Sequence, residues 1–192
     1  MDLSKLQEKY DKITADPKEG GNSDFLEKFF QLQMGTNLVR ILPWRDESKE
    51  FYAETSIHRV PDSKNDLEGQ ARNLHCLKTI GKKCPVCDLY YGLWKTGVEH
   101  DKAVARKIKG RERYYLNVLV RETNEVKILS IGKKLFGNIV SKILDPDYGD
   151  ITDLKKGFDY KIIKDVVKGS NGQDFPNYDK SLPRPKSEPA GT

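Results

Sequence analysis

The sequence predicts an α+β chain, mainly β, in which short strands form a small, partly open barrel with a metal-binding insertion. About five or six short strand-like runs are separated by turn signals, a spacing that is typical of small barrels. The three cysteines all lie within residues 76–87, where they interrupt the strand pattern. A run with helical spacing, residues 132–144, follows late in the chain and adds the α component.

The composition allows one domain of ordinary size. The chain has 192 residues, of which 36% are hydrophobic and 33% are charged. This is polar for a globular protein, so a metal ion that holds long loops together would support a modest core. No apolar run approaches the length of a membrane span, and we therefore expect no membrane partner. The net charge of +5 is too small to indicate nucleic-acid binding by itself.

The N-terminal part, residues 1–22, is predicted to be a helical arm with a linker. Its apolar residues fall on one helical face over residues 2–14, and Gly20-Gly21 then supplies a flexible link. Such an arm either docks elsewhere or packs on its own domain. The core is predicted over residues 23–180, and the Pro-, Lys- and Ser-rich residues 181–192 are predicted to be disordered.

Within the core, the residue pattern predicts each element in order. Residues 28–42 predict a hairpin that turns at Gly35-Thr-Asn37, because alternating residues flank a turn signal. Residues 61–75 predict a polar loop that leads into the cysteines. The remaining predicted elements are a strand at 51–60, a short helix at 88–95, strands at 114–121 and 126–131, a helix at 132–144 that ends at Asp145-Pro146, and a strand at 158–167.

The cysteines have the spacing of a zinc site. Cys84 and Cys87 form a Cys-X-X-Cys pair, so one tight turn can direct two thiolates at a single ion, and Cys76 adds a third. A redox pair would need a βαβ pattern around it, which is missing. The odd number of cysteines and the lack of an apolar signal segment argue against a disulfide framework. We expect one structural Zn²⁺, which prefers four tetrahedral ligands.

A histidine is needed to complete the site, and three are present. His58 ends a strand-like run and could reach back from a rigid element. His75 adjoins Cys76, so both would serve one ion from consecutive positions, which is an awkward geometry. His100 lies beyond a predicted helix. We favour His58 as the fourth ligand, with His75 as the alternative.

A basic run precedes a pair of tyrosines. Residues 102–113 carry six lysines and arginines against one acid, Glu112, and Tyr114-Tyr115 follow directly. Basic side chains attract phosphates, and tyrosine rings offer flat faces on which unstacked bases can lie. Because a duplex hides its base faces, this combination favours single strands. The alternatives are that the basic run is only a solvated surface, and that one of the two tyrosines is a core residue, since successive strand residues face opposite sides.

A series of short motifs lies along residues 28–182: Val39-Arg-Ile-Leu-Pro43, His58, Cys76, Cys84-Pro-Val-Cys87, Tyr114-Tyr-Leu-Asn-Val-Leu119, Gly132-Lys-Lys-Leu-Phe136 and Phe175-Pro-Asn-Tyr-Asp179. In these motifs and their order the chain resembles the single-stranded-DNA-binding, helix-destabilising proteins of T-even and related bacteriophages. The resemblance implies an OB-fold, a five-stranded barrel, with an inserted His-Cys₃ zinc subdomain at about 58–113, in which His58 takes the histidine place.

The resemblance also implies a DNA cleft between barrel and zinc subdomain. It implies that three aromatic residues stack on bases: Tyr115, Phe175 and Tyr178. It implies that the cleft is lined by Arg106, Lys107, Lys109, Arg111, Arg113, Lys133 and Lys134. The implied function is non-enzymatic, sequence-independent binding of single-stranded DNA in phage replication, recombination and repair, in the cytoplasm of the bacterial host. The implied partners are single-stranded DNA, further copies along it, and phage replication and recombination proteins.

Two features of the family have no counterpart here. The family carries a basic N-terminal motif for self-association, whereas residues 1–20 of this sequence are charge-balanced. The family also carries a long acidic C-terminal tail, and this sequence shows no such acidic segment. The spacing from His58 to Cys76 is also longer than in the family, which keeps His75 as an alternative ligand.

Two other functions compete with DNA binding. A zinc-bearing protein adaptor would be favoured if the aromatic residues proved to be buried. The hypothesis of a metal-dependent nuclease rests on a cluster of acidic residues in a loop that contains proline and glycine. Two-metal catalysis would need carboxylates that are held rigidly. These acids read better as turn residues: Asp145, Asp147, Asp150 and Asp153.

Overall fold

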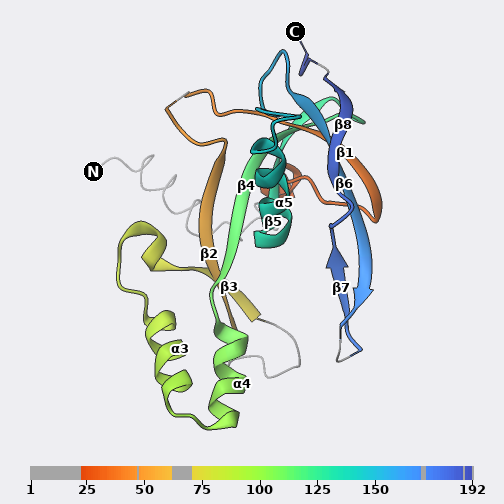
Figure 1. Ribbon diagram of the computed structural model, residues 1–192. Coiled ribbons are helices and arrows are strands. Elements are labelled where there is room, and N and C mark those ends of the chain that lie inside the picture. Colours follow the sequence, from red (N-terminus) through yellow and green to blue (C-terminus); the bar gives the residue numbers. More distant parts are fainter. Residues whose placement is uncertain (1–22, 47, 62–70, 170–171, 188, 192) are drawn as a thin grey trace, which may run out of the picture.

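The computed structural model describes residues 23–46, 48–61, 71–169, 172–187 and 189–191, and it shows a mainly antiparallel β structure with a few short helices (Figure 1). The strand order is β3-β2-β4-β1-β6-β7, with β5 paired to β4 and β8 paired to β6. The elements are α2 (Ser23–Glu27), β1 (Gly35–Ile41), β2 (Tyr52–Pro61), β3 (Ala71–His75), η2 (Leu77–Ile80), α3 (Pro85–Lys95), α4 (Glu99–Ile108), β4 (Arg111–Val120), β5 (Glu125–Gly132), α5 (Lys133–Ile143), β6 (Phe158–Lys168), β7 (Asp174–Asn177) and β8 (Leu182–Ser187).

The core lies between one face of the curved sheet and α5. Alternate residues of β4, among them Leu116 and Val118, point inward together with Val39 and Ile41 of β1. The apolar side of α5 closes this face, as the helical spacing of residues 132–144 predicted. The result is an OB-like α+β fold, which confirms the predicted fold class. The sheet described here has eight strands, whereas the expected barrel had five.

A subdomain built on long strands carries the cysteines. In Figure 1, β2 and β4 continue from the barrel toward α3 and α4, which lie beside each other at one end of the molecule. β2 pairs with β4 over Tyr52–Ile57 and with β3 over Ile57–Pro61, so one strand links the barrel to the subdomain. The start of β4, at Arg111, is therefore at the junction of the two parts.

Two predicted elements of the core differ from the structure. The predicted hairpin over residues 28–42 is wrong, because Gly35–Asn37 are paired with β6 as part of β1 instead of forming a turn. The side chain of Asn37 accepts a hydrogen bond from the backbone N–H of Gln33 at 2.8 Å and so serves the segment before the strand. The predicted loop at 61–75 ends in a strand, β3.

The chain end also differs from its prediction. Residues Leu182–Ser187 form β8, which pairs with β6, although their composition predicted disorder. Prolines are tolerated there because β8 is an edge strand that can spare backbone donors. The helix predicted over residues 2–14 lies outside the described residues. The predictions for residues 88–95, 114–121, 126–131 and 158–167 are confirmed within a few residues.

Candidate metal centre and nucleic-acid interface

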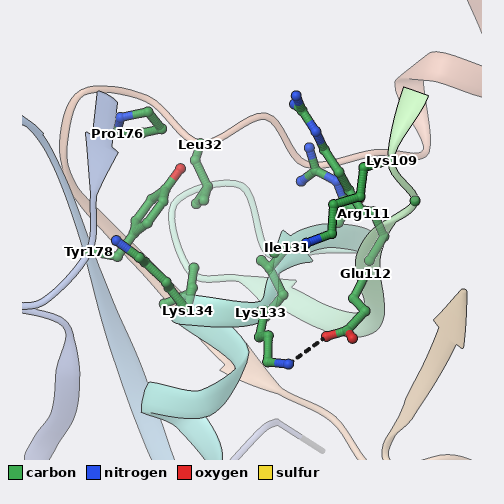
Figure 2. Close-up of a pocket in the computed structure, with 14 residues that line it drawn as sticks. Leu32, Lys109, Arg111, Glu112, Ile131, Lys133, Lys134, Pro176 and Tyr178 are labelled. Carbon is green, nitrogen blue, oxygen red and sulfur yellow. Dashed lines mark ion pairs between the residues drawn. The ribbon is translucent and has the colours of Figure 1, made fainter. Parts of the chain in front are cut away.

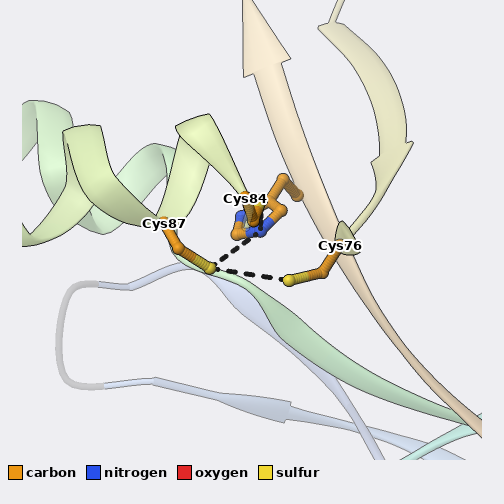
Figure 3. A group of neighbouring side chains, drawn as sticks. Cys76, Cys84 and Cys87 are labelled. Atoms are coloured by element: carbon orange, nitrogen blue, oxygen red, sulfur yellow. Dashed lines mark hydrogen bonds between the residues drawn. The ribbon is translucent and has the colours of Figure 1, made fainter. Parts of the chain in front are cut away.

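Four side chains converge between β2 and the start of α3: His58, Cys76, Cys84 and Cys87 (Figure 3). Their ligand atoms all lie within 4.8 Å of one another, and three of the four residues are buried. The Nε2 atom of His58 is 3.6 Å from the sulfur of Cys84 and 3.5 Å from that of Cys87. The sulfurs of Cys76 and Cys87 are 3.5 Å apart.

These separations fit a tetrahedral ion. Bonds of about 2.3 Å to sulfur and about 2.05 Å to nitrogen would place a sulfur and a nitrogen ligand about 3.5 Å apart and two sulfurs about 3.8 Å apart. The observed distances from His58 Nε2 to the sulfurs of Cys84 and Cys87, 3.6 and 3.5 Å, match the expected nitrogen–sulfur separation. The sulfurs of Cys76 and Cys87, at 3.5 Å, are slightly closer than the expected sulfur–sulfur separation. The cluster could therefore hold one metal ion with all positions filled by protein.

Backbone hydrogen bonds fix the ligands. The Nδ1 atom of His58 lies 2.8 Å from the carbonyl oxygen of Ile108, the last residue of α4. The N–H of Cys76 donates to the carbonyl of Ser56 at 2.8 Å. Cys84 immediately precedes α3, whose first residue is Pro85, so Cys87 falls on the first helical turn and faces the same point.

His75 lies on the opposite face of the strand ribbon from His58. In the β2–β3 pairing His75 is opposite Ile57, and His58 is opposite Leu74. Because adjacent residues of a strand point to opposite faces, His75 cannot face the cysteines while Cys76 does. His75 is exposed and contacts the hydroxyl of Thr55 at 3.3 Å. The structure thus places His58 with the cysteines and leaves His75 and His100 outside the cluster.

The thiols affect one another's ionisation. Burial raises the pKa of the Cys84 thiol, but hydrogen bonds from the backbone N–H groups of Cys87 and Leu77 outweigh this effect and lower the pKa to about 6. Burial, together with the neighbouring sulfurs of Cys76 and Cys84, raises the pKa of Cys87 to about 12. Several thiolates packed this closely repel one another unless a cation lies between them, which is the charge pattern of a metal site.

A cleft of about 600 Å³ lies beside the start of β4 and α5 (Figure 2). Its walls come from β4, β5, the start of α5, and the segment around β7. Basic side chains line it, together with one aromatic ring and apolar residues: Lys109, Arg111, Arg113, Lys133, Lys134, Tyr178, Leu32 and Pro176. Of the predicted DNA-binding residues, six therefore meet in this cleft.

Among the residues that the structure describes, most basic side chains of the cleft have no acidic partner. Lys133 pairs with Glu112 at 3.1 Å, and this hydrogen-bonded pair raises the pKa of the ammonium group. Neither Arg111 nor Arg113 forms an ion pair with any residue that the structure describes. Burial raises the pKa of the Tyr178 hydroxyl, and the charge of Arg113 partly offsets this effect, which places the two side chains near each other.

Arg106 and Lys107 do not line the cleft. Both are exposed on α4. Arg106 pairs with Glu99 at 2.6 Å and lies over the ring of Trp94, 5.8 Å from its centroid. The structure therefore divides the predicted basic run between a helix surface and the cleft.

The two adjacent tyrosines have different environments. Tyr114 is buried and stacks on Phe136 of α5, with ring centroids 3.8 Å apart and planes at 3°. Tyr115 points to the other face of β4, is half-buried, and meets Phe29 edge to face at 6.3 Å. Its cross-strand partner is Ser130, which lines the cleft. Tyr115 itself does not line the cleft, but it shares its sheet face with Arg111 and Arg113, which do.

The other two predicted aromatic residues lie around β7. Phe175 is 46% exposed on this edge strand, outside the residues that line the cleft. Tyr178 follows the strand, is half-buried against the core, and lines the cleft. None of the three predicted stacking residues is fully buried, whereas the protein-adaptor alternative would be favoured by buried aromatic residues.

The sequence reasoning missed Arg59. This exposed residue of β2 lines a second cavity with Arg111 and Arg113. Arg59 directly follows His58 of the candidate metal site and so must face the opposite side of β2. That alternation was a usable signal, but it needed the pairing of β2 with β4.

Three of the four acidic residues that prompted the nuclease alternative accept hydrogen bonds from backbone N–H groups of their own loop. Asp150 accepts hydrogen bonds from the backbone and hydroxyl of Thr152, and Asp153 accepts from the N–H groups of Lys155 and Lys156. Asp145 accepts from the N–H of Asp147. Among the described residues, the one group of side chains that could hold a metal contains none of these aspartates.

The chain matches a known family model. A family model described as "gp32 DNA binding protein like" matches residues 33–191, which is more than half of the chain. No curated protein matches the chain. Within the described segments, no helix is long and apolar enough to cross a membrane.

Proposed function

The chain belongs to the family described as gp32 DNA binding protein like, and we propose that it binds single-stranded DNA without sequence preference. The observation that carries this proposal is one sheet face on which a half-buried tyrosine lies beside two arginines that form no ion pair with any described residue. Arg111, Arg113 and Tyr115 are alternate residues of β4 and therefore share that face.

The chemistry of this face suits a single strand. Phosphates along the backbone are attracted to Arg111, Arg113 and the lysines at the start of α5, and each neutralised phosphate releases counterions. Bases that are not paired can stack on Tyr115, on Tyr178 and on Phe175 at the edge strand, a contact that tolerates any base. A duplex offers phosphates but no free base faces, so it would use only part of this surface.

We propose that the metal is Zn²⁺ and that its role is structural. Three thiolates and one imidazole form the donor set that this ion prefers, and they leave no open position for a substrate. The ion would hold α3, η2 and β2 together in a subdomain at about residues 58–113. Because His58 also contacts the end of α4, the ion would fix the chain where it enters β4.

The biological setting is a further part of this proposal. A sequence-independent binder would protect and straighten single strands during phage DNA replication, recombination and repair, in the cytoplasm of the bacterial host. Its partners would be single-stranded DNA, further copies of the protein along it, and phage replication and recombination proteins. These roles rest on the family and on no contact seen in this chain.

The test is binding to labelled single-stranded DNA and to a duplex of the same sequence, with and without Mg²⁺. We expect retention of the single strand without cleavage, and weaker retention of the duplex. Cleavage that depends on Mg²⁺ would favour a nuclease. Retention of neither nucleic acid by the metal-loaded protein would overturn the proposal and favour an adaptor.

A further inference from the structure

A second, smaller cavity of about 290 Å³ adjoins the main cleft. It is lined by residues of three adjacent strands: Ile57 and Arg59 of β2, Ala71 and Asn73 of β3, and Arg111 and Arg113 of β4. Among the described residues its walls contain three arginines and no acid. Arg111 and Arg113 also line the main cleft, so the two cavities meet at β4.

The strand registers place these side chains on one face. Ile57 is opposite Arg111 across β2 and β4, and Arg59 is opposite Asn73 across β2 and β3. Directly opposed residues and alternate residues along a strand share a face. This face is the one that carries Tyr115, and His58 with its metal site lies on the other side.

The chemistry of the cavity selects an anion with several oxygens. Guanidinium groups present donors in a planar fork that matches a phosphate, and the amide of Asn73 can add another donor. Arg59 is exposed and forms no ion pair with any residue in the described parts of the chain. The described lining residues include no aromatic ring on which a base could stack, so the cavity fits the backbone of a nucleic acid better than a base.

We propose that Arg59, together with Arg111 and Arg113, binds a backbone phosphate of single-stranded DNA beyond the main cleft, so that the strand crosses β4 and continues over β2 and β3. This proposal rests on the proposed function and extends the DNA path onto β2 and β3, where the sequence indicated no DNA-binding residue. Arg111 and Arg113 are shared by both cavities, whereas Arg59 belongs only to the second. A substitution of Arg59 therefore tests the second cavity without changing the lining of the main cleft.

The experiment measures the salt dependence of binding to oligo(dT) of increasing length by fluorescence anisotropy, with the metal-loaded protein. The variant Arg59→Gln removes the charge from an exposed position, and Arg45→Gln, an exposed arginine between β1 and β2, is the matched control. For long oligonucleotides we expect Arg59→Gln to flatten the log–log salt slope by about 0.7, the value of one phosphate contact. A fourfold rise in salt would then cost the wild type about 2.6-fold more affinity than the variant.

Oligonucleotide length separates this inference from the proposed function. For the shortest oligonucleotide that the wild type still binds, we expect Arg59→Gln to behave as the wild type, while Arg111→Gln weakens binding at every length. An unchanged slope for Arg59→Gln at all lengths, or an equal effect at all lengths, would overturn the second site while single-strand binding by the wild type stands. If the wild type binds no single strand, the proposed function itself fails. Metal content and thermal unfolding of each variant confirm that it is folded.

Discussion

His58 contacts the carbonyl oxygen of Ile108 through Nδ1 at 2.8 Å, which leaves Nε2 facing the sulfurs of Cys84 and Cys87. A neutral imidazole that donates from Nδ1 has its lone pair on Nε2, the form that a metal needs. Ile108 ends α4, and Arg111 begins β4 shortly after it. One side chain therefore links the metal cluster to the strand that carries the proposed DNA-binding arginines.

The first prediction separates the two candidate histidines. We expect His58→Ala to lose the metal on dialysis and His75→Ala to keep it, because only His58 lies among the cysteines. Structural zinc sites contribute on the order of 10–16 kcal/mol of apparent folding free energy in small peptides, so the subdomain should unfold in His58→Ala. Elemental analysis and thiol reactivity measure both effects. A greater metal loss in His75→Ala than in His58→Ala would contradict the ligand assignment.

The second prediction concerns Gly110, which lies against His58 of the candidate metal site. A Cβ atom at this position would be 2.6 Å from the hydroxyl of Ser56 and 3.1 Å from Cε1 of His58. We expect Gly110→Ala to lower stability by about 1–3 kcal/mol, as overpacking does. The double variant Gly110→Ala/Ser56→Ala should recover only part of this loss, because the contact with His58 remains.

Denaturant unfolding and competition with a chelator measure the effect of Gly110→Ala. The matched control is Gly137→Ala on α5, where nothing lies within 4 Å of the added carbon. That change should stabilise the helix by up to about 1 kcal/mol. If Gly110→Ala proved as harmless as Gly137→Ala, the close approach of Gly110 to His58 would be disproved.

The third prediction concerns the ion pair in the cleft wall. Glu112 holds Lys133 at 3.1 Å, and both side chains are exposed. We expect Glu112→Gln to tighten binding to single-stranded DNA, because it removes a negative charge from the cleft and releases Lys133. If Lys133 then contacts one phosphate, the salt slope should steepen by about 0.7.

Glu125→Gln is the control for Glu112→Gln. Glu125 also pairs with a lysine, Lys127, at 3.1 Å, but neither residue lines the cleft. Its removal should leave the salt slope unchanged. Equal effects of the two substitutions on DNA affinity would mean that only the net charge of the protein matters, and that Glu112 and Lys133 do not border the DNA.

The sequence was sufficient to predict those features that have a strong local residue pattern. The helical spacing before Asp145-Pro146 predicted α5, and the cysteine spacing predicted the metal cluster. In the structure, the alternation of strand residues places His58 with the cysteines and His75 on the other face. These features depend on neighbours in the sequence, which is why they could be read without coordinates.

The missed features depend on distant pairing. Gly35–Asn37 has the composition of a turn, yet β6 holds it as a strand. The proline-rich β8 is ordered by β6, where Pro183 lies opposite Tyr160. The role of Arg59 depends on which strands flank β2, a fact that no local spacing contains.

The last prediction concerns the adjacent residues Tyr114 and Tyr115. Tyr114 packs in the core against Phe136, so Tyr114→Ala should lower the free energy of unfolding by about 3–5 kcal/mol. Tyr115 lies on the other face of β4, is half-buried and meets Phe29 edge to face, so Tyr115→Ala should cost much less stability. Its binding to single-stranded DNA should weaken by roughly 1–3 kcal/mol, or about 5- to 140-fold.

Aromatic replacements identify stacking as the cause. Tyr115→Phe and Tyr115→Trp should nearly preserve affinity, because a base stacks on the ring and does not need the hydroxyl group. Thermal unfolding and anisotropy titration of all four variants show whether each tyrosine contributes to stability or to DNA affinity. If Tyr115→Ala lost stability and kept its affinity while Tyr114→Ala did the reverse, the two faces of β4 would be exchanged. The arginines at positions 111 and 113, which share the face of Tyr115, would then have to leave the DNA path as well.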